Sequence, residues 1–379
     1  MTPSDIYILQ PRAWSILSRS FASQRIAGTY LIEGNRGTGR WFLAVTLAQL
    51  LNCETPLDAS PSERIQLPCG TCRSCRLIGS MNFPGLYVAL PVEKHKNLDH
   101  AHELISELLQ RKRDDPFADI NSPGATSIPI DVARAIKKDL SRRAADDITR
   151  VVIFHEMDKM RADSADALLK LIEEPPPRTT IILTVERAHN LLPTIQSRSQ
   201  KIKLNRIAST VIEQLLRDHY HIPPESAQLY SRIADGSLGR AMALSAHDSP
   251  ELEHRHTYAG LFSTLILASP SQAISRIGEC LTQRDRTAAD ELLRLWQSLL
   301  RDCGTWATLA DDTMITNIDY LDDIKRLAGH FTDQQQLVHM SQTIKNTLAD
   351  LKLNVHIQGA LAALALRMSQ LLPQQAEGR

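Results

Sequence analysis

A glycine-rich stretch is the part of this sequence best suited to chemistry. It reads Gly34-Asn35-Arg36-Gly37-Thr38-Gly39-Arg40-Trp41, and its spacing follows the G-x-x-x-x-G-K-[ST] frame of phosphate-binding loops. In such loops backbone N–H groups cradle the phosphates, the lysine reaches the β- and γ-phosphates, and the hydroxyl binds Mg²⁺. Here Arg40 replaces the lysine and Trp41 replaces the hydroxyl. An indole offers only an N–H donor and no oxygen, so the loop has lost its metal ligand. Its glycines are kept.

A second candidate site lies at the end of the apolar segment Val151–Phe154, where His155-Glu156-Met157-Asp158 follows. In P-loop ATPases this position supplies an aspartate to Mg²⁺ and often a glutamate that polarises the attacking water. His155 stands in the place of the metal aspartate, and Glu156 stands in the place of the base. Histidine is a poor ligand for a hard cation. Trp41 and His155 therefore affect the same metal ion, and we expect a nucleotide site that no longer hydrolyses ATP.

Four of the six cysteines have a spacing typical of a metal site: Cys53, Cys69, Cys72 and Cys75. Tetrahedral Zn²⁺ binds four thiolates, and the Cys-x-x-Cys spacing lets backbone N–H groups support them. Such a site has no open position, so the role of the zinc would be structural. Scattered reduced thiols are the alternative. A redox dithiol is a further alternative, although the segment does not follow a strand as such motifs do.

The elements that must position these residues follow from hydrophobic periodicity. Short apolar strands are expected over residues 29–33, 86–90, 150–154 and 180–184, and helices over 12–26, 41–51, 98–111, 130–144 and 162–172. This alternation predicts a parallel α/β sheet as far as about residue 204. Residues 207–245 then read as a small helical unit broken at Pro223-Pro224 and Gly236, and residues 250–372 as a longer helical region.

Composition and charge exclude several classes of protein. The 379 residues carry 43 Lys+Arg and 43 Asp+Glu, so no strong global field draws the chain to nucleic acid. The sequence shows no signal-peptide pattern and no apolar run of membrane-spanning length. We therefore expect a cytoplasmic protein, in which six cysteines do not form a disulfide framework.

Two further motifs follow the glycine loop and the cysteines in order. The first is Ala165-Asp166-Ala167-Leu168-Leu169-Lys170 leading to Glu173-Glu174-Pro175-Pro176, and the second is Leu192-Pro193-Thr194-Ile195-Gln196-Ser197-Arg198-Ser199. Together the set resembles the AAA+ clamp-loader family of bacterial DNA polymerase III, and within it the delta-prime subunits. The resemblance covers about residues 10–245, and the helical remainder fits the collar domain of the family.

The resemblance implies a chain of three parts. Residues 1–204 would form an AAA+ domain of the P-loop NTPase type, with a zinc module at about 53–80 and a surface insertion at about 92–127. Residues 205–247 would form a small helical lid, and residues 248–379 an all-helical collar that packs against partner subunits.

The resemblance also implies roles for single residues. Arg198 matches an arginine that reaches the γ-phosphate in a neighbouring subunit, so it would act in trans. Gly236-Ser237-Leu238-Gly239-Arg240-Ala241 resembles the second sensor of the family, and the first sensor falls near Thr184-Val185. The residues of a relic nucleotide site would be Gly34, Gly37, Gly39, Arg40, Glu156 and Arg240. Ser199 departs from the cysteine, and Asp166 from the asparagine, that are usual in the family.

The implied function is that of a subunit in a hetero-pentamer with gamma/tau-like and delta-like partners, which loads a sliding clamp on primed DNA and has no contact with a membrane. Independent catalysis is not expected, because the metal ligands are missing. Two alternatives remain open: an active gamma/tau-like ATPase, and a zinc-containing DNA-binding protein with a relic ATPase fold. Lys137, Lys138, Arg142 and Arg143 would either grip DNA phosphates or form a solvated helix face. Residual ATP binding, direct contact with DNA, the role of the insertion and the collar helices that meet each partner are also left open.

Overall fold

The fold consists of two compact units. The structure, a computed structural model, describes residues 1–60, 62–93, 97–120, 126–142, 148–161, 168–246, 249–268, 270–281, 285–331, 333–353 and 355–372. The first unit comprises Met1–His221 and Ala234–Met242, and the second comprises Ile222–Ile233 and Ala243–Arg379. The predicted division into three domains stays a prediction.

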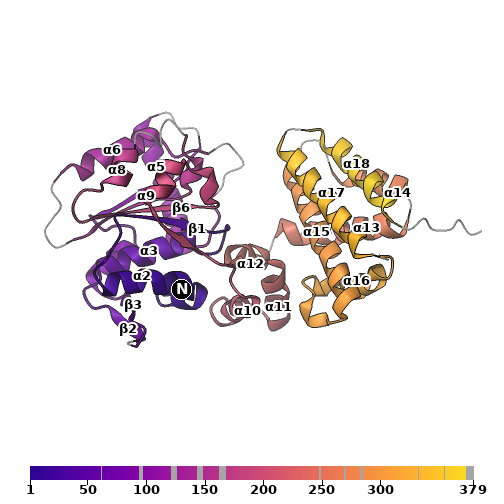
Figure 1. The fold of residues 1–379 in the computed structure, drawn as a ribbon, viewed down its shortest axis with the longest axis horizontal. Helices are drawn as coiled ribbons and strands as arrows, with labels where there is room; N and C mark the ends of the chain where they lie inside the picture. The colour runs from indigo at the N-terminus through magenta and orange to yellow at the C-terminus, as the bar shows by residue number, and fades with distance from the viewer. Residues whose placement is uncertain are drawn as a thin grey trace, which may run out of the picture. The chain divides into compact units, whose positions relative to one another are not determined.

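A five-stranded parallel sheet forms the centre of the first unit (Figure 1). Its strands are β4 (Leu86–Ala89), β5 (Arg150–Phe154), β6 (Thr179–Val185), β1 (Thr29–Glu33) and β7 (Gln200–Lys203), in this spatial order. β1 pairs with β6 and β7, and β5 pairs with β4 and β6, all in parallel. The carboxyl ends of β1, β5 and β6 therefore meet at one edge, which brings the glycine loop and the His155-Glu156 segment together. The predicted parallel α/β sheet is confirmed.

Helices cover both faces of this sheet. Figure 1 shows α2 (Pro11–Ala22) and α3 (Arg40–Leu51) on one face. On the other face lie α6 (Ile130–Leu140), α8 (Leu169–Glu173) and α9 (Pro193–Arg198). Every residue of α3 from Arg40 to Leu50 is buried, which fits a helix that is apolar on all sides. Part of the helix predicted over 162–172, residues 162–167, lies outside the described residues, as does Arg143 beyond α6.

Shorter elements complete the first unit. They are α1 (Asp5–Leu9), the antiparallel hairpin β2 (Leu57–Ser60) and β3 (Ile65–Leu67), α4 (Arg73–Gly79), α5 (Leu98–Asp114), α10 (Ser209–Asp218) and α12 (Leu238–Ser245), of which α12 ends beyond the unit. The helix predicted over 98–111 is thus confirmed as α5. The helical character predicted for 207–245 is also confirmed, with α11 (Pro224–Ile233) assigned to the second unit.

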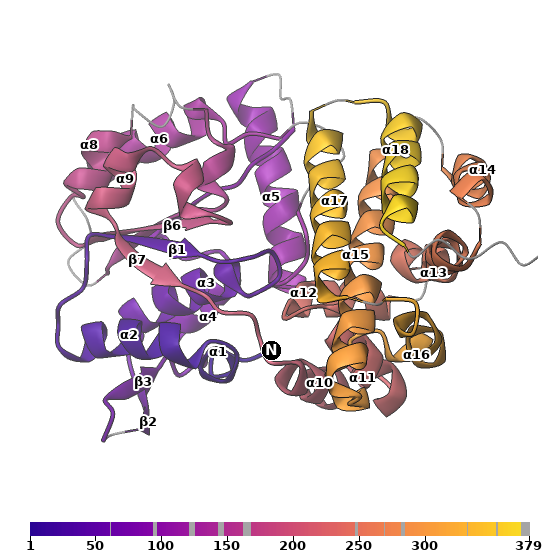
Figure 2. The same cartoon turned by 45° about the vertical axis from the view of Figure 1, so that its right-hand side comes forward.

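The second unit is helical throughout its described residues. Its longer helices are α13 (Pro250–Leu267), α14 (Pro270–Cys280), α15 (Arg286–Leu309), α16 (Leu321–Ala328), α17 (Gln334–Lys352) and α18 (Ile357–Gln370). α15 packs against α13, α16 and α17, and α17 lies beside α18 (Figure 2). Trp296 on α15 is fully buried and its indole N–H donates to Tyr258 O at 2.9 Å. The predicted helical C-terminal region is confirmed, and none of the described helices has the length and apolarity needed to span a bilayer.

Candidate functional site

The glycine loop connects β1 to α3 and adopts a conformation that requires glycine. Gly37 has a φ of +69° and Gly39 a φ of +97°, in the left-handed region where other side chains are strained. A Cβ at Gly37 would also lie only 2.1 Å from Ser237 Oγ. Thr38 Oγ1 donates a hydrogen bond to Asn35 O at 2.7 Å, which closes the loop internally. The loop thus has the tight backbone turn that the sequence predicts.

Arg40 points into the protein. Its side chain is 5% exposed, and Nη2 lies 3.2 Å from Oε1 of Glu156, whose side chain is 6% exposed. Lys159 Nζ lies 2.7 Å from Glu156 Oε2, so one carboxylate pairs with two cations. Arg40 Nη1 is buried without a hydrogen-bond partner among the described residues. Arg40, which stands in the place of the phosphate-binding lysine, is therefore paired with Glu156, which stands in the place of the catalytic base.

The two positions that would hold Mg²⁺ contain rings packed against each other. The Trp41 and His155 rings meet edge to face with centroids 5.3 Å apart. His155 Nδ1 lies 2.8 Å from Thr184 Oγ1, which also accepts a hydrogen bond from the Glu156 N–H at 3.1 Å. Burial, followed by the charges of neighbouring cations such as Lys112, holds the pKa of His155 well below its usual value. This favours the neutral imidazole. Thr184, one of the two residues near which the first sensor is predicted, is hydrogen-bonded inside the chain.

A turn after α5 covers the glycine loop, and we name residues 115–120 the covering turn. Phe117, in this turn, is 5% exposed, and its ring lies 5.7 Å from that of Phe42. The Phe117 ring is also 3.3 Å from the position of a Cβ built on Gly39. Its carbonyl oxygen is 2.7 Å from a Cβ built on Gly239, so no larger residue fits there. The covering turn thus lies against both the glycine loop and the segment that resembles the second sensor.

Lys112 at the end of α5 is buried beneath the same turn. Its Nζ donates hydrogen bonds to Ala118 O at 2.6 Å and Pro116 O at 3.3 Å. Burial lowers the pKa of Lys112 to about 8, an effect that the nearby negative charge of Glu156 opposes. The insertion expected on the surface therefore has a buried part. Lys94, Lys96 and Ser122-Pro123-Gly124 of that insertion lie outside the described residues.

The segment that resembles the second sensor contacts the glycine loop directly. Gly239 N–H donates a hydrogen bond to Gly37 O at 3.3 Å, and Gly236 has a φ of +81°. Ser237 Oγ accepts a hydrogen bond from the Arg240 N–H at 3.1 Å, at the start of α12. The backbone of Arg240 is thus placed next to the loop, while contact of its side chain with a phosphate stays a prediction.

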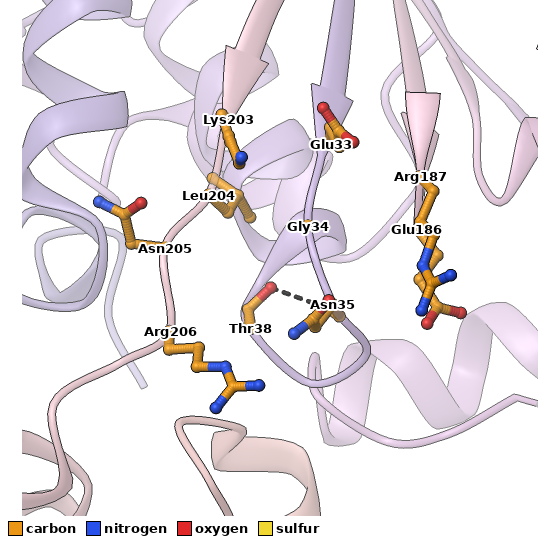
Figure 3. A pocket seen from close by; sticks show the side chains of 10 residues that line it. All are labelled: Glu33, Gly34, Asn35, Thr38, Glu186, Arg187, Lys203, Leu204, Asn205 and Arg206. Carbon is orange, nitrogen blue, oxygen red and sulfur yellow. Dashed lines mark hydrogen bonds between the residues drawn. The ribbon is translucent and has the colours of Figure 1, made fainter. Parts of the chain in front are cut away.

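A cavity of about 360 Å³ lies beside the loop, at the carboxyl ends of β1, β6 and β7 (Figure 3). It is lined by Glu33, Gly34, Asn35, Thr38, Glu186, Arg187, Lys203, Leu204, Asn205 and Arg206. Three of its charged residues make polar contacts within the chain. Glu33 accepts a hydrogen bond from the Ala188 N–H at 3.0 Å, Arg36 Nε lies 3.6 Å from Glu186, and Arg206 pairs with Asp235. Ligand binding in this cavity was not predicted from the sequence, and its mixed charge indicates no particular ligand.

Arg198 is the last residue of α9, and about half of its side chain is exposed. Its Nε lies 2.6 Å from Glu173 Oε1 at the end of α8, and Nη1 donates to Ser197 Oγ at 3.3 Å. Its ion-pair partner thus belongs to the Glu-Glu-Pro-Pro motif and not to the glycine loop. This places the guanidinium at the protein surface, within reach of another molecule.

The four predicted metal-ligating cysteines come together. The sulfur atoms of Cys53, Cys69, Cys72 and Cys75 all lie within 4.8 Å of one another. Backbone N–H groups donate to three of these sulfurs at 3.2–3.4 Å. Burial raises the pKa of Cys69, but hydrogen bonds from Thr55 and its other neighbours outweigh burial and lower it to about 5. Four converging sulfurs, with N–H donors to support thiolates, fit a tetrahedral metal ion.

Comparison with known proteins identifies the family. A family model described as DNA polymerase III, delta subunit matches residues 9–208, more than half of the chain, and the chain belongs to this family. The delta' subunit of DNA polymerase III from Bacillus subtilis is 24% identical over 96% of this chain and 97% of its own length. The delta' subunit from Pseudomonas aeruginosa is 27% identical over 62% of this chain and 60% of that protein. The predicted resemblance to delta-prime subunits is confirmed.

The similarity extends to a second type of subunit. The tau subunit of DNA polymerase III from Salmonella typhimurium is 27% identical over 62% of this chain, which corresponds to 31% of that protein. The relatives therefore include both delta' and tau subunits.

Proposed function

We propose that this protein is a delta-prime-like AAA+ subunit of a DNA polymerase III clamp loader, that it works in the cytoplasm, and that it has little or no ATPase activity of its own. Family membership supports the role as a subunit. The observation that supports the lack of hydrolysis is the buried ion pair between Arg40 and Glu156, 3.2 Å apart. It joins the two residues that an active site of this type would direct at the nucleotide.

Each requirement for ATP hydrolysis meets an obstacle in the first unit. The Mg²⁺ ligands are replaced by Trp41 and His155, whose rings pack edge to face. Glu156 is already paired with both Arg40 and Lys159, so it is poorly suited to activate a water molecule. Phe117 lies against Gly39, and the backbone of Gly239 lies against Gly37. Both glycines belong to the loop that would face the phosphates. An incoming nucleotide would have to displace the covering turn. This arrangement argues against the alternative of an active gamma/tau-like ATPase.

In the proposed complex Arg198 would serve the active site of a neighbour. A guanidinium in trans stabilises the negative charge that develops on the transferred phosphoryl group, and such a residue accelerates hydrolysis by about 10³- to 10⁵-fold in other ATP- and GTP-hydrolysing systems. Exposure of Arg198 at the end of a short, well-anchored helix suits this role. The neighbours would be gamma/tau-like and delta-like subunits, and the complex would load a sliding clamp on primed DNA.

We also propose a structural zinc ion held by Cys53, Cys69, Cys72 and Cys75. Bound zinc would cross-link the end of α3 to the segment that leads into α4. Measurement of the zinc content of the purified chain tests this, with one equivalent expected for the wild type and much less for Cys69→Ser. Cys280→Ser is the matched control, because Cys280 is exposed and lies outside the cluster. A wild-type chain that is folded and contains no metal would contradict the zinc site.

The experiment that tests the proposed function is reconstitution with gamma/tau-like and delta-like subunits. The isolated chain should release no phosphate from ATP, whereas the complex should hydrolyse ATP in the presence of primed DNA and clamp. Arg198→Ala should lower that DNA-stimulated rate by at least about tenfold and leave assembly intact. Arg217→Ala is the control, since Arg217 is also an exposed arginine near the end of a helix. Unchanged turnover of the complex with Arg198→Ala would contradict the trans role of Arg198. Rapid ATP hydrolysis by the isolated chain would contradict the proposal that it has little or no ATPase activity of its own.

A further inference from the structure

We propose that Glu173 is a positioning residue that orients Arg198 for its contact with a neighbour's nucleotide, an inference that rests on the proposed function. The two side chains form an ion pair with 2.6 Å between Arg198 Nε and Glu173 Oε1. Both are partly exposed, at 46% for Arg198 and 35% for Glu173. The pair is therefore formed at the surface before any partner subunit arrives.

Glu173 stands on a part of the fold that holds its place. It is the last residue of α8, and the preceding Ile172 is 1% exposed. Ile172 O accepts a hydrogen bond from Thr29 Oγ1 on β1 at 2.8 Å. Two residues beyond Glu173, Pro175 packs closely on Gly28: a Cβ built on Gly28 would lie 3.1 Å from the Pro175 ring. Contacts with Thr29 at the start of β1 and with Gly28 just before it, one on each side of Glu173, thus fix the backbone that carries its carboxylate.

Arg198 is anchored in a similar way from the other helix. α9 packs against α8, and Ile195 on α9 is fully buried. Ser199 Oγ donates to Ile195 O at 2.8 Å, which ties the residue after Arg198 to the same helix. The backbones of Glu173 and Arg198 are therefore fixed relative to each other, and their ion pair restricts the remaining rotations of the arginine side chain.

The atoms used in the pair explain its effect. A guanidinium is planar and presents its five N–H donors in a fixed fork. Glu173 binds the Nε, on the inner part of the fork. Among the described residues, the outer nitrogens then carry only the 3.3 Å contact from Nη1 to Ser197 Oγ, which a phosphate oxygen would replace with a charge-assisted hydrogen bond. Fixing the side chain in advance also reduces the conformational entropy that is lost when the phosphate is bound.

A contribution to the free energy of folding does not account for the ion pair between Glu173 and Arg198. Ion pairs between partly exposed side chains contribute little to the free energy of folding. Loss of Glu173 should thus leave the thermal midpoint and the assembly of the complex almost unchanged, while the rate of ATP hydrolysis falls. A residue with only a structural role would give the opposite pattern.

The test uses the reconstituted clamp loader and its DNA-stimulated ATPase. Glu173→Ala should lower kcat about five- to tenfold with little change in the KM for ATP, and Glu173→Gln, which keeps an acceptor without the charge, should lower it about two- to threefold. Glu174→Ala, which removes the exposed adjacent carboxylate, should behave as the wild type. Because Glu173 acts through Arg198, the double variant Glu173→Ala/Arg198→Ala should be no slower than Arg198→Ala alone.

The outcomes separate this inference from the function on which it rests. If Arg198→Ala is slow and both Glu173 variants have wild-type kcat, the positioning role is wrong and the trans role stands. If Arg198→Ala is itself as fast as the wild type, the trans role is wrong. A double variant clearly slower than Arg198→Ala would show that Glu173 acts by another route and would also overturn the inference. Should Glu173→Ala fail to assemble, the isosteric Glu173→Gln decides between these results.

Discussion

At the scale of single residues, the ion pair between Arg40 and Glu156 gives the clearest test of how the region next to the glycine loop is held together. Glu156→Gln keeps the shape of the side chain and removes its charge, so Arg40 and Lys159 would be left without their carboxylate partner. Removal of one partner from a buried pair destabilises proteins by roughly 3–5 kcal/mol. We expect a loss of this order in the free energy of unfolding, measured by urea denaturation.

A matched control for this prediction exists near the same loop. Glu186 pairs with Arg36 at 3.6 Å, and both side chains are well exposed. Glu186→Gln should cost less than about 1 kcal/mol, because water already screens the pair. A Glu156→Gln variant no less stable than Glu186→Gln would show that the Arg40 pair is not a buried element of the fold.

Lys112 predicts how stability depends on pH. Its folded-state pKa of about 8 lies below its usual value of 10.5, so the unfolded chain binds more protons at alkaline pH. The contribution of Lys112 to stability must then rise with pH through this range. We expect the stability of the wild type relative to Lys112→Met to increase by roughly 2 kcal/mol between about pH 7 and about pH 10. A difference that is flat with pH would mean that Lys112 titrates as it does in water.

The sequence predicted the roles of the residues in the glycine loop and after β5 better than it predicted the partners that they contact. Trp41 and His155 could be recognised because a known motif specifies what should stand in their places. The pairing of Arg40 with Glu156 could not be predicted, because the two are 116 positions apart and the motif directs both at a ligand. Phe117 and Lys112 carried no signal at all, since they follow no motif and lie in a segment rich in charged residues.

At the scale of elements, the covering turn predicts a local change on truncation of Phe117. Phe117→Ala should destabilise the protein by about 3–5 kcal/mol, as expected for a buried phenylalanine. It should also speed hydrogen exchange at the Gly37, Gly39 and Arg40 amides by at least about tenfold, because the ring lies over Gly39. Mass spectrometry of exchanged peptides measures this.

Phe83→Ala supplies the control for that measurement. Phe83 is 6% exposed, close to the 5% of Phe117, and it packs near Gly85. Its loss should cost a similar free energy of unfolding without a selective effect on the glycine loop. Equal exchange rates in the loop of both variants would contradict a specific covering role for Phe117.

Hydrophobic pattern explains which elements were predictable. Strands 29–33 and 150–154 match β1 and β5 residue for residue, because each contains a continuous apolar run and lies in the middle of the sheet. β7 was not predicted, since only Ile202 of its four residues is buried and it forms an edge of the sheet. The β2–β3 hairpin was missed for a related reason: β2 is largely exposed and has no alternating pattern.

At the scale of the whole molecule, the balance of charge predicts weak binding to DNA. With 43 basic and 43 acidic residues, the isolated chain should bind primed DNA with a dissociation constant weaker than about 10⁻⁶ M at physiological salt. Arg142, two residues beyond the end of α6, does not change this expectation, because its Nη1 lies 3.7 Å from Asp139. Fluorescence anisotropy with labelled primed DNA measures the affinity. Nanomolar binding that survives moderate salt would favour the alternative of a DNA-binding protein.

The division of the molecule was less predictable than its elements. The change from an α/β region to a helical region was visible in the sequence, because apolar strand-like runs stop after residue 204. In the sequence, α11 stands between α10 and the start of α12, which both belong to the first unit. The assignment of α11 to the second unit could not be predicted from composition. It depends on contacts such as the hydrogen bond from Arg232 Nη1 to Ile315 O, at 2.7 Å, between residues far apart in the chain.

Phe117 belongs to the same polypeptide as the glycines that it covers. A small molecule leaves its site when it is diluted, whereas a tethered side chain keeps the same effective local concentration at any dilution. The closed loop should consequently persist through dialysis, and it should be indifferent to the ratio of ATP to ADP in the cell. Within the proposed clamp loader, such a subunit would offer its partners a surface of constant shape.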